Sequence, residues 1–129
     1  MPDWPATVDP AAAWYHGSPE ALTELRPGST ITQDRDLARV FSHRPTLVDD
    51  GRAEGGALRH NGRRPGWLYT VAEPLRLGDL APIPGSTLAG KEWHTTRPLR
   101  VVPSGATAPV PAERLSPERE AALRGSGAA

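Results

Sequence analysis

Residues 14–42, WYHGSPEALTELRPGSTITQDRDLARVFS, decide the fold. Together with the two alanines before them they open on a short apolar run, 12–16, which predicts a strand with Trp14 and His16 on one face. The strand ends on a histidine and is followed at once by Gly17. A strand that served only to fill a core would not need this ending, so the stretch raises a functional question.

The rest of the stretch predicts two helices with a turn and a short strand between them. Ser18, Pro19 and Glu20 supply an N-cap, a proline at the first position and an acid in the first turn, so a short helix with Ala21, Leu22 and Leu25 on its apolar side is expected there. The turn is expected at 26–29 and the strand at 30–32. Asp34 is the expected N-cap of the second helix, whose apolar stripe contains Leu37, Ala38, Val40 and Phe41 and which Pro45 ends.

Further along the chain, short strands alternate with Pro- and Gly-rich segments. Residues 49–66 are polar and predict a long loop or a hairpin turning at Asn61-Gly62. The segment 67–75, WLYTVAEPL, is the clearest strand, and 92–102 predicts one or two more. Residues 77–90 form a Pro/Gly-rich connector. This pattern predicts an α+β fold, with an arm at 1–11, one domain at 12–102, and a low-complexity linker and a short helix at 103–129.

Composition narrows the function classes. The 129 residues contain 15 Lys plus Arg and 15 Asp plus Glu, which argues against a nucleic-acid or membrane-surface binder. There are no cysteines, so disulfides and thiolate chemistry are excluded. The first residues show neither a basic region nor an apolar region of a secretion signal, and no run is long enough to cross a bilayer, so a cytoplasmic location is expected.

The four histidines, His16, His43, His60 and His94, are not spaced as metal ligands, and no metal site is expected. His16 has two interpretations. It is either a partly buried ring that a backbone carbonyl satisfies, or a ligand-binding ring. Gly17 beside it leaves the backbone open to a ligand and Ser18 adds a hydroxyl. An imidazole, a bare amide and a hydroxyl together suit a ribose and a planar carboxamide.

Two further features carry both a functional and a plain interpretation. Glu92 lies before a predicted strand, where its carboxylate suits a ribose hydroxyl and a developing positive charge on a sugar. It is equally explained as a surface residue at a strand end. The basic cluster RHNGRR at 59–64 is best explained as a solvated hairpin tip, with a phosphate clamp as the alternative.

The order and spacing of several short motifs resemble a known family. The motifs are YHGS, L..LRPGS, D.DLARVFS, WLYTV.EP and TTRPLRVV, and they cover residues 13–102. Together they resemble the small bacterial ADP-ribosyltransferase-like proteins, most of all the compact rifampin ADP-ribosyltransferases. The resemblance implies a split, twisted antiparallel β-core with a few short helices and NAD in the cleft between its halves.

The resemblance also implies roles for single residues. His16 matches the family's ribose-binding histidine, and Gly17 matches the residue whose backbone pairs with the nicotinamide carboxamide. The family's stacking tyrosine falls at Thr30 or Ile31, so that aromatic ring is missing here. Other candidates that the resemblance suggests are Tyr69 or an Arg or His60 of the 49–66 loop for stacking, Arg26 or Arg35 for the pyrophosphate, and Glu92 or Asp79 for the acid, with Glu92 preferred.

The implied activity is transfer of ADP-ribose from NAD to a small-molecule or protein acceptor, with release of nicotinamide. NAD is then a co-substrate, and no nucleic acid or membrane takes part. Because the tyrosine is absent, the alternative is a non-catalytic ADP-ribosyltransferase-like binding module. The sequence does not identify the acceptor.

Overall fold

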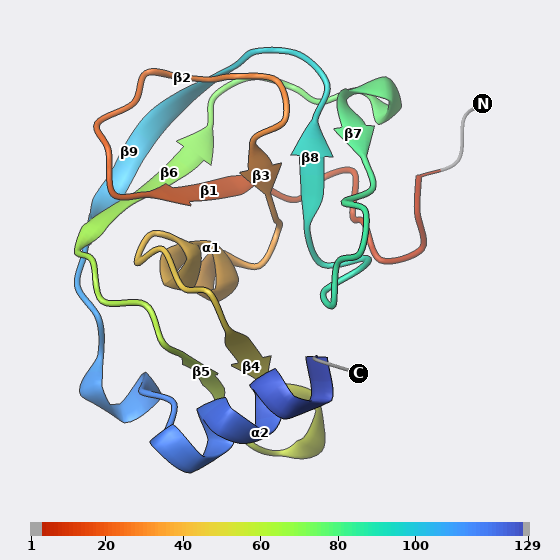
Figure 1. The fold of residues 1–129 in the computed structure, drawn as a ribbon. Coiled ribbons are helices and arrows are strands. Elements are labelled where there is room, and N and C mark those ends of the chain that lie inside the picture. The colour runs from red at the N-terminus through yellow and green to blue at the C-terminus, as the bar shows by residue number, and fades with distance from the viewer. Residues whose placement is uncertain (1–3, 128–129) are drawn as a thin grey trace.

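The computed structural model describes residues 4–127, which form a mixed α+β fold of curled antiparallel sheets and two α-helices (Figure 1). In chain order, the elements are β1 (Tyr15–Ser18), β2 (Glu24–Leu25), β3 (Thr30–Ile31), α1 (Arg35–Phe41), β4 (Val48–Asp50), η1 (Arg52–Glu54), β5 (Leu58–His60), β6 (Gly66–Val71), η2 (Leu77–Asp79), β7 (Leu80–Ala81), β8 (Trp93–Thr95), β9 (Leu99–Thr107), η3 (Pro111–Glu113) and α2 (Pro117–Gly127). No helix among residues 4–127 is long and apolar enough to span a bilayer.

The strands form three antiparallel sheets. One has the order β1-β6-β9-β2, the second has the order β3-β8-β7, and β4 pairs with β5 in a hairpin. A single bridge between Tyr15 and Thr32 connects the first two sheets, with hydrogen bonds of 2.7 and 3.0 Å. Beyond that bridge β1 and β3 are not paired, so the two sheets separate at the end of β1 that carries Gly17.

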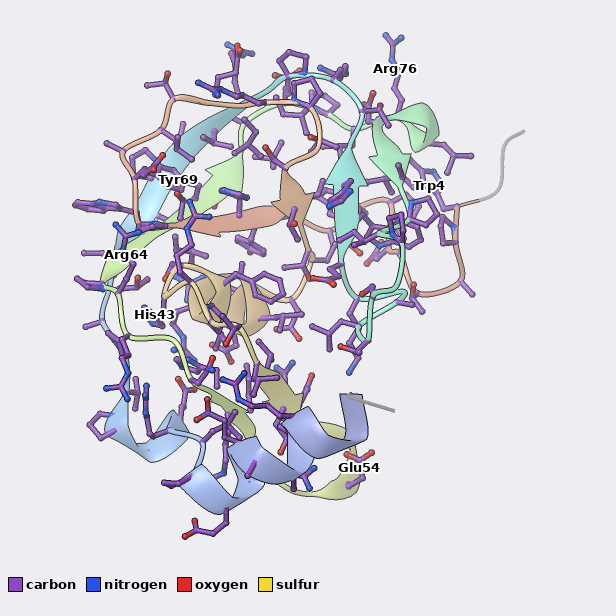
Figure 2. All side chains as sticks on the ribbon, viewed as in Figure 1. Trp4, His43, Glu54, Arg64, Tyr69 and Arg76 are labelled. Carbon is purple, nitrogen blue, oxygen red and sulfur yellow. The ribbon has the colours of Figure 1, made fainter. Side chains whose placement is uncertain are left out.

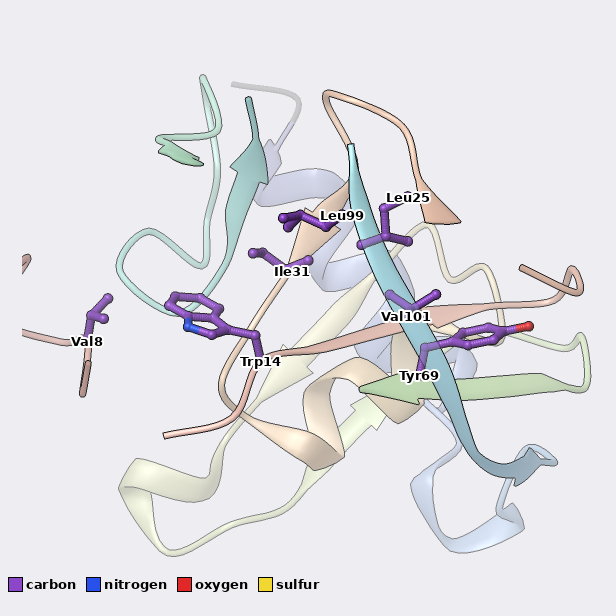
Figure 3. Packing of buried hydrophobic residues seen from close by; sticks show 7 residues of the cluster. All are labelled: Val8, Trp14, Leu25, Ile31, Tyr69, Leu99 and Val101. Carbon is purple, nitrogen blue, oxygen red and sulfur yellow. The ribbon is translucent and has the colours of Figure 1, made fainter. Parts of the chain in front are cut away.

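The main core lies around β9, between the first two sheets. Figure 3 shows its buried residues, Val8, Trp14, Leu25, Ile31, Tyr69, Leu99 and Val101. A smaller cluster, made of Leu37, Val40 and Leu58, packs α1 against the β4–β5 hairpin. Trp14 is the only aromatic residue besides Tyr69 among the buried residues of the described chain, so the core is mostly aliphatic, as the low aromatic content indicated.

The helix predicted after Asp34 is confirmed. Asp34 caps it by accepting a hydrogen bond from the Leu37 amide at 3.1 Å. Leu37, Ala38 and Val40 are buried along one stripe. The chain leaves the helix with Arg44 in the left-handed region at φ 54° and continues into Pro45, which cannot extend a helix.

The helix predicted from Ser18 is wrong. The Ser18 hydroxyl does accept a hydrogen bond from the Glu20 amide at 3.1 Å, but no helical turn follows. Instead the chain continues into β2, which pairs with β9 and buries Leu25 at 1% exposure. Burial of this leucine against β9 outweighs the local preference for a helix that Ser18, Pro19 and Glu20 provide.

The hairpin predicted in 49–66 exists, but its turn is not at Asn61-Gly62. The chain reverses between β4 and β5, where Gly55 adopts φ 80°. Gly62 serves packing instead, since a Cβ atom there would lie 2.7 Å from the His43 carbonyl oxygen. β9 also continues to Thr107, through residues that were expected to be linker.

Candidate functional site

A cleft of about 680 Å³ opens where the first two sheets separate. Arg26, a pyrophosphate candidate, lines it after β2. It is joined by five further site candidates from the sequence, namely His16, Gly17, Ser18, Thr30 and Glu92. They come from β1, β3 and the start of β8, which are brought together by the Tyr15–Thr32 bridge and the pairing of β3 with β8. A concave volume of this size suits a small organic ligand.

The His16 ring is fixed in one tautomer. Its Nδ1–H donates a hydrogen bond of 2.6 Å to the carbonyl oxygen of Thr30, which leaves Nε2 as an acceptor without a partner among residues 4–127. Burial lowers the pKa of His16 below its ordinary value, and the Arg44 guanidinium adds to this shift, although the hydrogen bond to Thr30 opposes it. The ring is therefore neutral at pH 7 and offers a lone pair to a hydroxyl group.

Gly17 leaves a backbone edge open to the cleft. Trp14 accepts a hydrogen bond from Val71 on β6, while Tyr15 bonds to Thr32 on the other side. Because hydrogen bonding alternates along an antiparallel strand, the N–H and C=O of Gly17 point away from β6, on the same side as those of Tyr15. β3 has diverged there, so these two groups have no hydrogen-bond partner among residues 4–127 and can pair with a planar amide.

Gly17 is also required for packing. A Cβ atom at this position would lie 1.8 Å from the Ala38 carbonyl oxygen and 2.6 Å from the Ser42 nitrogen. Helix α1 therefore packs directly on the backbone of β1. The missing side chain has a structural reason as well as the one inferred from the sequence.

Glu92 is held in the cleft by a neighbouring serine. It precedes β8, and its Oε1 accepts a hydrogen bond of 2.6 Å from the Ser86 hydroxyl. Ser86 in turn accepts a hydrogen bond from the Leu88 amide at 2.9 Å, which fixes the hydroxyl. The second carboxylate oxygen of Glu92 has no hydrogen-bond partner among the described residues and is available to a ligand.

Asp79, the alternative acid, lies outside the cleft. It is buried at 6% exposure at the end of η2, where its carboxylate accepts hydrogen bonds from Arg97 at 2.9 and 3.1 Å and from the Arg76 amide at 2.8 Å. Burial alone would raise the pKa of Asp79, but these hydrogen bonds hold it below its ordinary value. The carboxylate thus connects η2 to Arg97, in the segment before β9, through hydrogen bonds.

Tyr69 and Arg35 also lie outside the cleft. Tyr69 is buried at 2% exposure, and its hydroxyl donates to the Glu20 carbonyl at 2.7 Å and accepts from the Leu22 amide at 2.9 Å. Figure 3 shows this hydroxyl pointing away from the core cluster. Since Glu20 and Leu22 line the cleft, Tyr69 supports a wall of the cleft from behind. Arg35 is exposed at the start of α1.

The 49–66 loop supplies no stacking residue to the cleft, so the candidates suggested there, an Arg or His60, are wrong. None of its residues, all of which the structure describes, lines the cleft, and His60 is buried at 1% exposure. The basic cluster at 59–64 is used within the fold. There Arg59 donates to the Ala112 carbonyl, and the Arg64 carbonyl accepts from His43.

Phe41 and Arg44 are among the cleft residues that sequence reasoning missed. Phe41 ends α1 and is half-buried, and its spacing from Leu37 made it look like an ordinary core position. Arg44 follows the helix end with a left-handed backbone at φ 54°, which no sequence signal revealed.

Among residues 4–127, no group of three or more His, Asp or Glu side chains is arranged to hold a metal ion. In comparisons with known proteins, no protein-family model, no curated protein and no solved structure matches this chain. The chemistry of the cleft therefore has to be inferred from its own residues.

Proposed function

We propose that this protein binds NAD in the cleft and transfers its ADP-ribose to a small-molecule or protein acceptor, releasing nicotinamide. The observation that carries the proposal is the meeting of His16, Gly17, Ser18, Thr30 and Glu92 in one cleft from distant parts of the chain. We also propose that the fold is a split β-core of the ADP-ribosyltransferase type.

Gly17, His16 and Glu92 each have a partner on NAD in this proposal. The open N–H and C=O of Gly17 bind the nicotinamide carboxamide, which has one acceptor and two donors. The neutral His16 ring accepts a ribose hydroxyl through Nε2. Ser86 holds one carboxylate oxygen of Glu92, which lines the same cleft. The other oxygen accepts a hydrogen bond from the second ribose hydroxyl and stabilises positive charge on the sugar.

In the reaction, the bond between ribose C1′ and the nicotinamide nitrogen breaks. Its electron pair leaves with the nitrogen, so the pyridinium becomes neutral nicotinamide. The oxocarbenium ion that remains on the ribose is stabilised by Glu92, and an acceptor hydroxyl or water attacks C1′ and releases its proton. NAD⁺ and the acceptor thus give ADP-ribosylated acceptor, nicotinamide and one proton.

Two arginines of the cleft suit the pyrophosphate. Arg26 and Arg44 line it, and neither guanidinium forms a hydrogen bond or ion pair with the described residues. Several arginines outside the cleft are engaged with carboxylates, as Arg39 is with Glu113 and Arg52 with Asp34. Unpaired guanidinium groups in a cleft are suited to a doubly charged phosphate ligand.

Phe41 provides an aromatic surface that Thr30 lacks. Its ring lines the cleft with Gly17, whose backbone binds the carboxamide in this proposal. Stacking of the nicotinamide ring on a phenyl ring contributes on the order of 1 kcal/mol beyond its burial. Phe41 therefore takes the place that the resemblance assigned to a tyrosine on the second strand.

The test is to incubate the purified chain with NAD and to separate nicotinamide from NAD by chromatography. Nicotinamide must appear in proportion to protein, with ADP-ribose or an ADP-ribosylated acceptor as the second product. A folded protein that binds NAD by calorimetry but releases no nicotinamide with any acceptor would support the second candidate, a non-catalytic NAD-binding module. The absence of a tyrosine at Thr30 is the observation that favours this second candidate.

A further inference from the structure

Two stacked imidazole rings lie in the interior, outside the cleft. The ring centroids of His43 and His60 are 5.4 Å apart and their planes differ by 19°. The two residues are 0% and 1% exposed, and neither Nε2 atom has a hydrogen-bond partner among residues 4–127. Figure 2 shows His43 at the end of α1, close to Arg64. The proposed function uses neither ring.

The hydrogen bonds of the two Nδ1 atoms fix the tautomer of each neutral ring. His43 Nδ1–H donates to the Arg64 carbonyl at 2.6 Å, whereas His60 Nδ1 accepts from the Gly62 amide at 3.0 Å. His43 thus carries its proton on Nδ1, and His60 carries it on Nε2. Burial lowers the pKa of both rings below the ordinary value.

The surrounding charges do not favour an added proton. Arg39 faces the pair from α1, Glu113 from η3, and Arg114 follows Glu113. The carboxylate of Glu113 lies 3.8 Å from His60 Nε2, but Arg39 already occupies both of its oxygens, at 2.8 and 2.6 Å. A proton on His60 would therefore face His43 and the guanidinium groups of Arg39 and Arg114, and a proton on His43 would face that of Arg39; Glu113 opposes these effects only in part.

The pair is directly connected to a wall of the cleft. Arg44, Pro45 and Thr46 line the cleft and follow His43 in the chain. The amides of Thr46 and Leu47 both donate to Asn61 Oδ1 at 2.9 Å, and Asn61 follows His60. The segment 44–47 is thus anchored at one end by His43 and at the other by the neighbour of His60.

We propose that the stacked His43–His60 pair is an acid-sensitive latch that holds segment 44–47 against the cleft. A proton added to either ring separates the rings, and the segment then loses its anchors, so acidification opens this wall. The proposal concerns regulation of the cleft and holds whichever small ligand the cleft binds.

The direction of the pH dependence follows from the lowered pKa values. Unfolded or released histidines take up protons near pH 6.5, whereas the latched rings resist protonation until a lower pH. As pH falls below about 6.5, protonation of each released ring raises the equilibrium constant between the open and latched forms by up to about tenfold per pH unit. At higher pH both forms are neutral, and the latch is insensitive to pH.

The test uses the full chain without NAD, so its outcome is independent of the proposed function. Ring and amide signals are followed by NMR while pH is lowered from about 7.5 to about 5, and urea unfolding is measured over the same range. The matched variant is His43→Asn with His60→Asn. It retains a donor toward Arg64 and an acceptor toward Gly62 but removes both titrations.

In the wild type, the amide signals of Thr46 and Leu47 must change at the pH at which the two rings titrate. The unfolding constant must rise at least about tenfold more in the wild type than in the double variant as pH falls through this range. Unchanged Thr46 and Leu47 signals during ring titration would overturn the proposal, as would equal pH dependence of the two proteins. If the double variant does not fold, the Thr46 and Leu47 amide signals of the wild type are sufficient to test the proposal.

Discussion

The Nδ1 atom of His16 donates a hydrogen bond of 2.6 Å to the carbonyl oxygen of Thr30, which joins β1 of one sheet to β3 of the other. The bond lies just beyond the Tyr15–Thr32 bridge, where the sheets separate. It fixes the ring tautomer and leaves Nε2 available to a ligand. One side chain therefore has two separable roles, one in joining the sheets and one in the cleft.

Two variants of His16 separate these roles. His16→Asn retains a donor near the Nδ1 position but has no group at Nε2, whereas His16→Gln reaches the Nε2 position but loses the donor to Thr30. We expect the Asn variant to keep its stability and to bind NAD about 2- to 10-fold more weakly, because one neutral hydrogen bond is lost. Calorimetry with NAD and urea unfolding measure the two effects. An Asn variant that binds NAD like the wild type would remove His16 from the site.

Gly17→Ala must destabilise the fold. The added methyl group would lie 1.8 Å from the Ala38 carbonyl oxygen, so α1 must move away from β1. We expect the free energy of unfolding to fall by about 1–3 kcal/mol or more. The control is Gly125→Ala in α2, where an added Cβ meets no atom within 4 Å and helix propensity predicts a gain of about 0.5–1 kcal/mol. Equal stability of Gly17→Ala and wild type in urea would show that the observed packing is wrong.

Tyr69→Phe tests the support behind the cleft wall. Removal of the hydroxyl leaves the Leu22 amide and the Glu20 carbonyl without their shared partner. We expect a loss of about 1–3 kcal/mol in the free energy of unfolding. Because Tyr69 does not contact NAD, the variant should bind NAD more weakly through a more mobile wall. Saturating NAD should therefore restore most of the rate of nicotinamide release. A complete loss of turnover in a folded variant would instead place Tyr69 in direct contact with NAD.

Asp79→Asn is expected to affect stability and not chemistry. The pKa of Asp79 is lower in the folded state than its ordinary value of 3.8. The ionised carboxylate therefore stabilises the fold fully at pH values above 3.8, and this stabilisation is lost as pH falls through the folded-state pKa. The variant must therefore be less stable than wild type at about pH 7, and the difference must shrink as pH falls below 3.8 toward the folded-state pKa. Urea unfolding at several pH values measures it. A difference that stays constant with pH would contradict the ion pair with Arg97.

The sequence predicted the parts of the fold that local signals control. Asp34 with the stripe from Leu37 to Phe41 was sufficient for α1, and the alternation around Tyr69 was sufficient for β6. It failed where tertiary packing decided. Leu25 is in a strand because β9 buries it, and Gly62 lies in a packing contact with His43 although Asn-Gly usually signals a turn.

The candidate site was predicted in part for similar reasons. His16, Gly17 and Glu92 stood out because their chemistry at strand ends is unusual, and they do line one cleft. The choice between Glu92 and Asp79 required the structure, since only the partner Arg97 shows that Asp79 is committed elsewhere. Phe41 could not be recognised, because a cleft-lining aromatic residue at the end of an apolar stripe has the same spacing as a core residue.

The central claim is that Glu92 stabilises positive charge on the ribose of NAD in this cleft. The most direct measurement is the rate of nicotinamide release at saturating NAD for wild type, Glu92→Gln and Asp79→Asn, each shown to be folded by urea unfolding. We expect Glu92→Gln to lower the rate about 100-fold or more, because a preorganised charge facing the reacting sugar is lost. Asp79→Asn should stay near the wild-type rate. Wild-type turnover in Glu92→Gln, or loss of turnover in a folded Asp79→Asn, would contradict this role of Glu92.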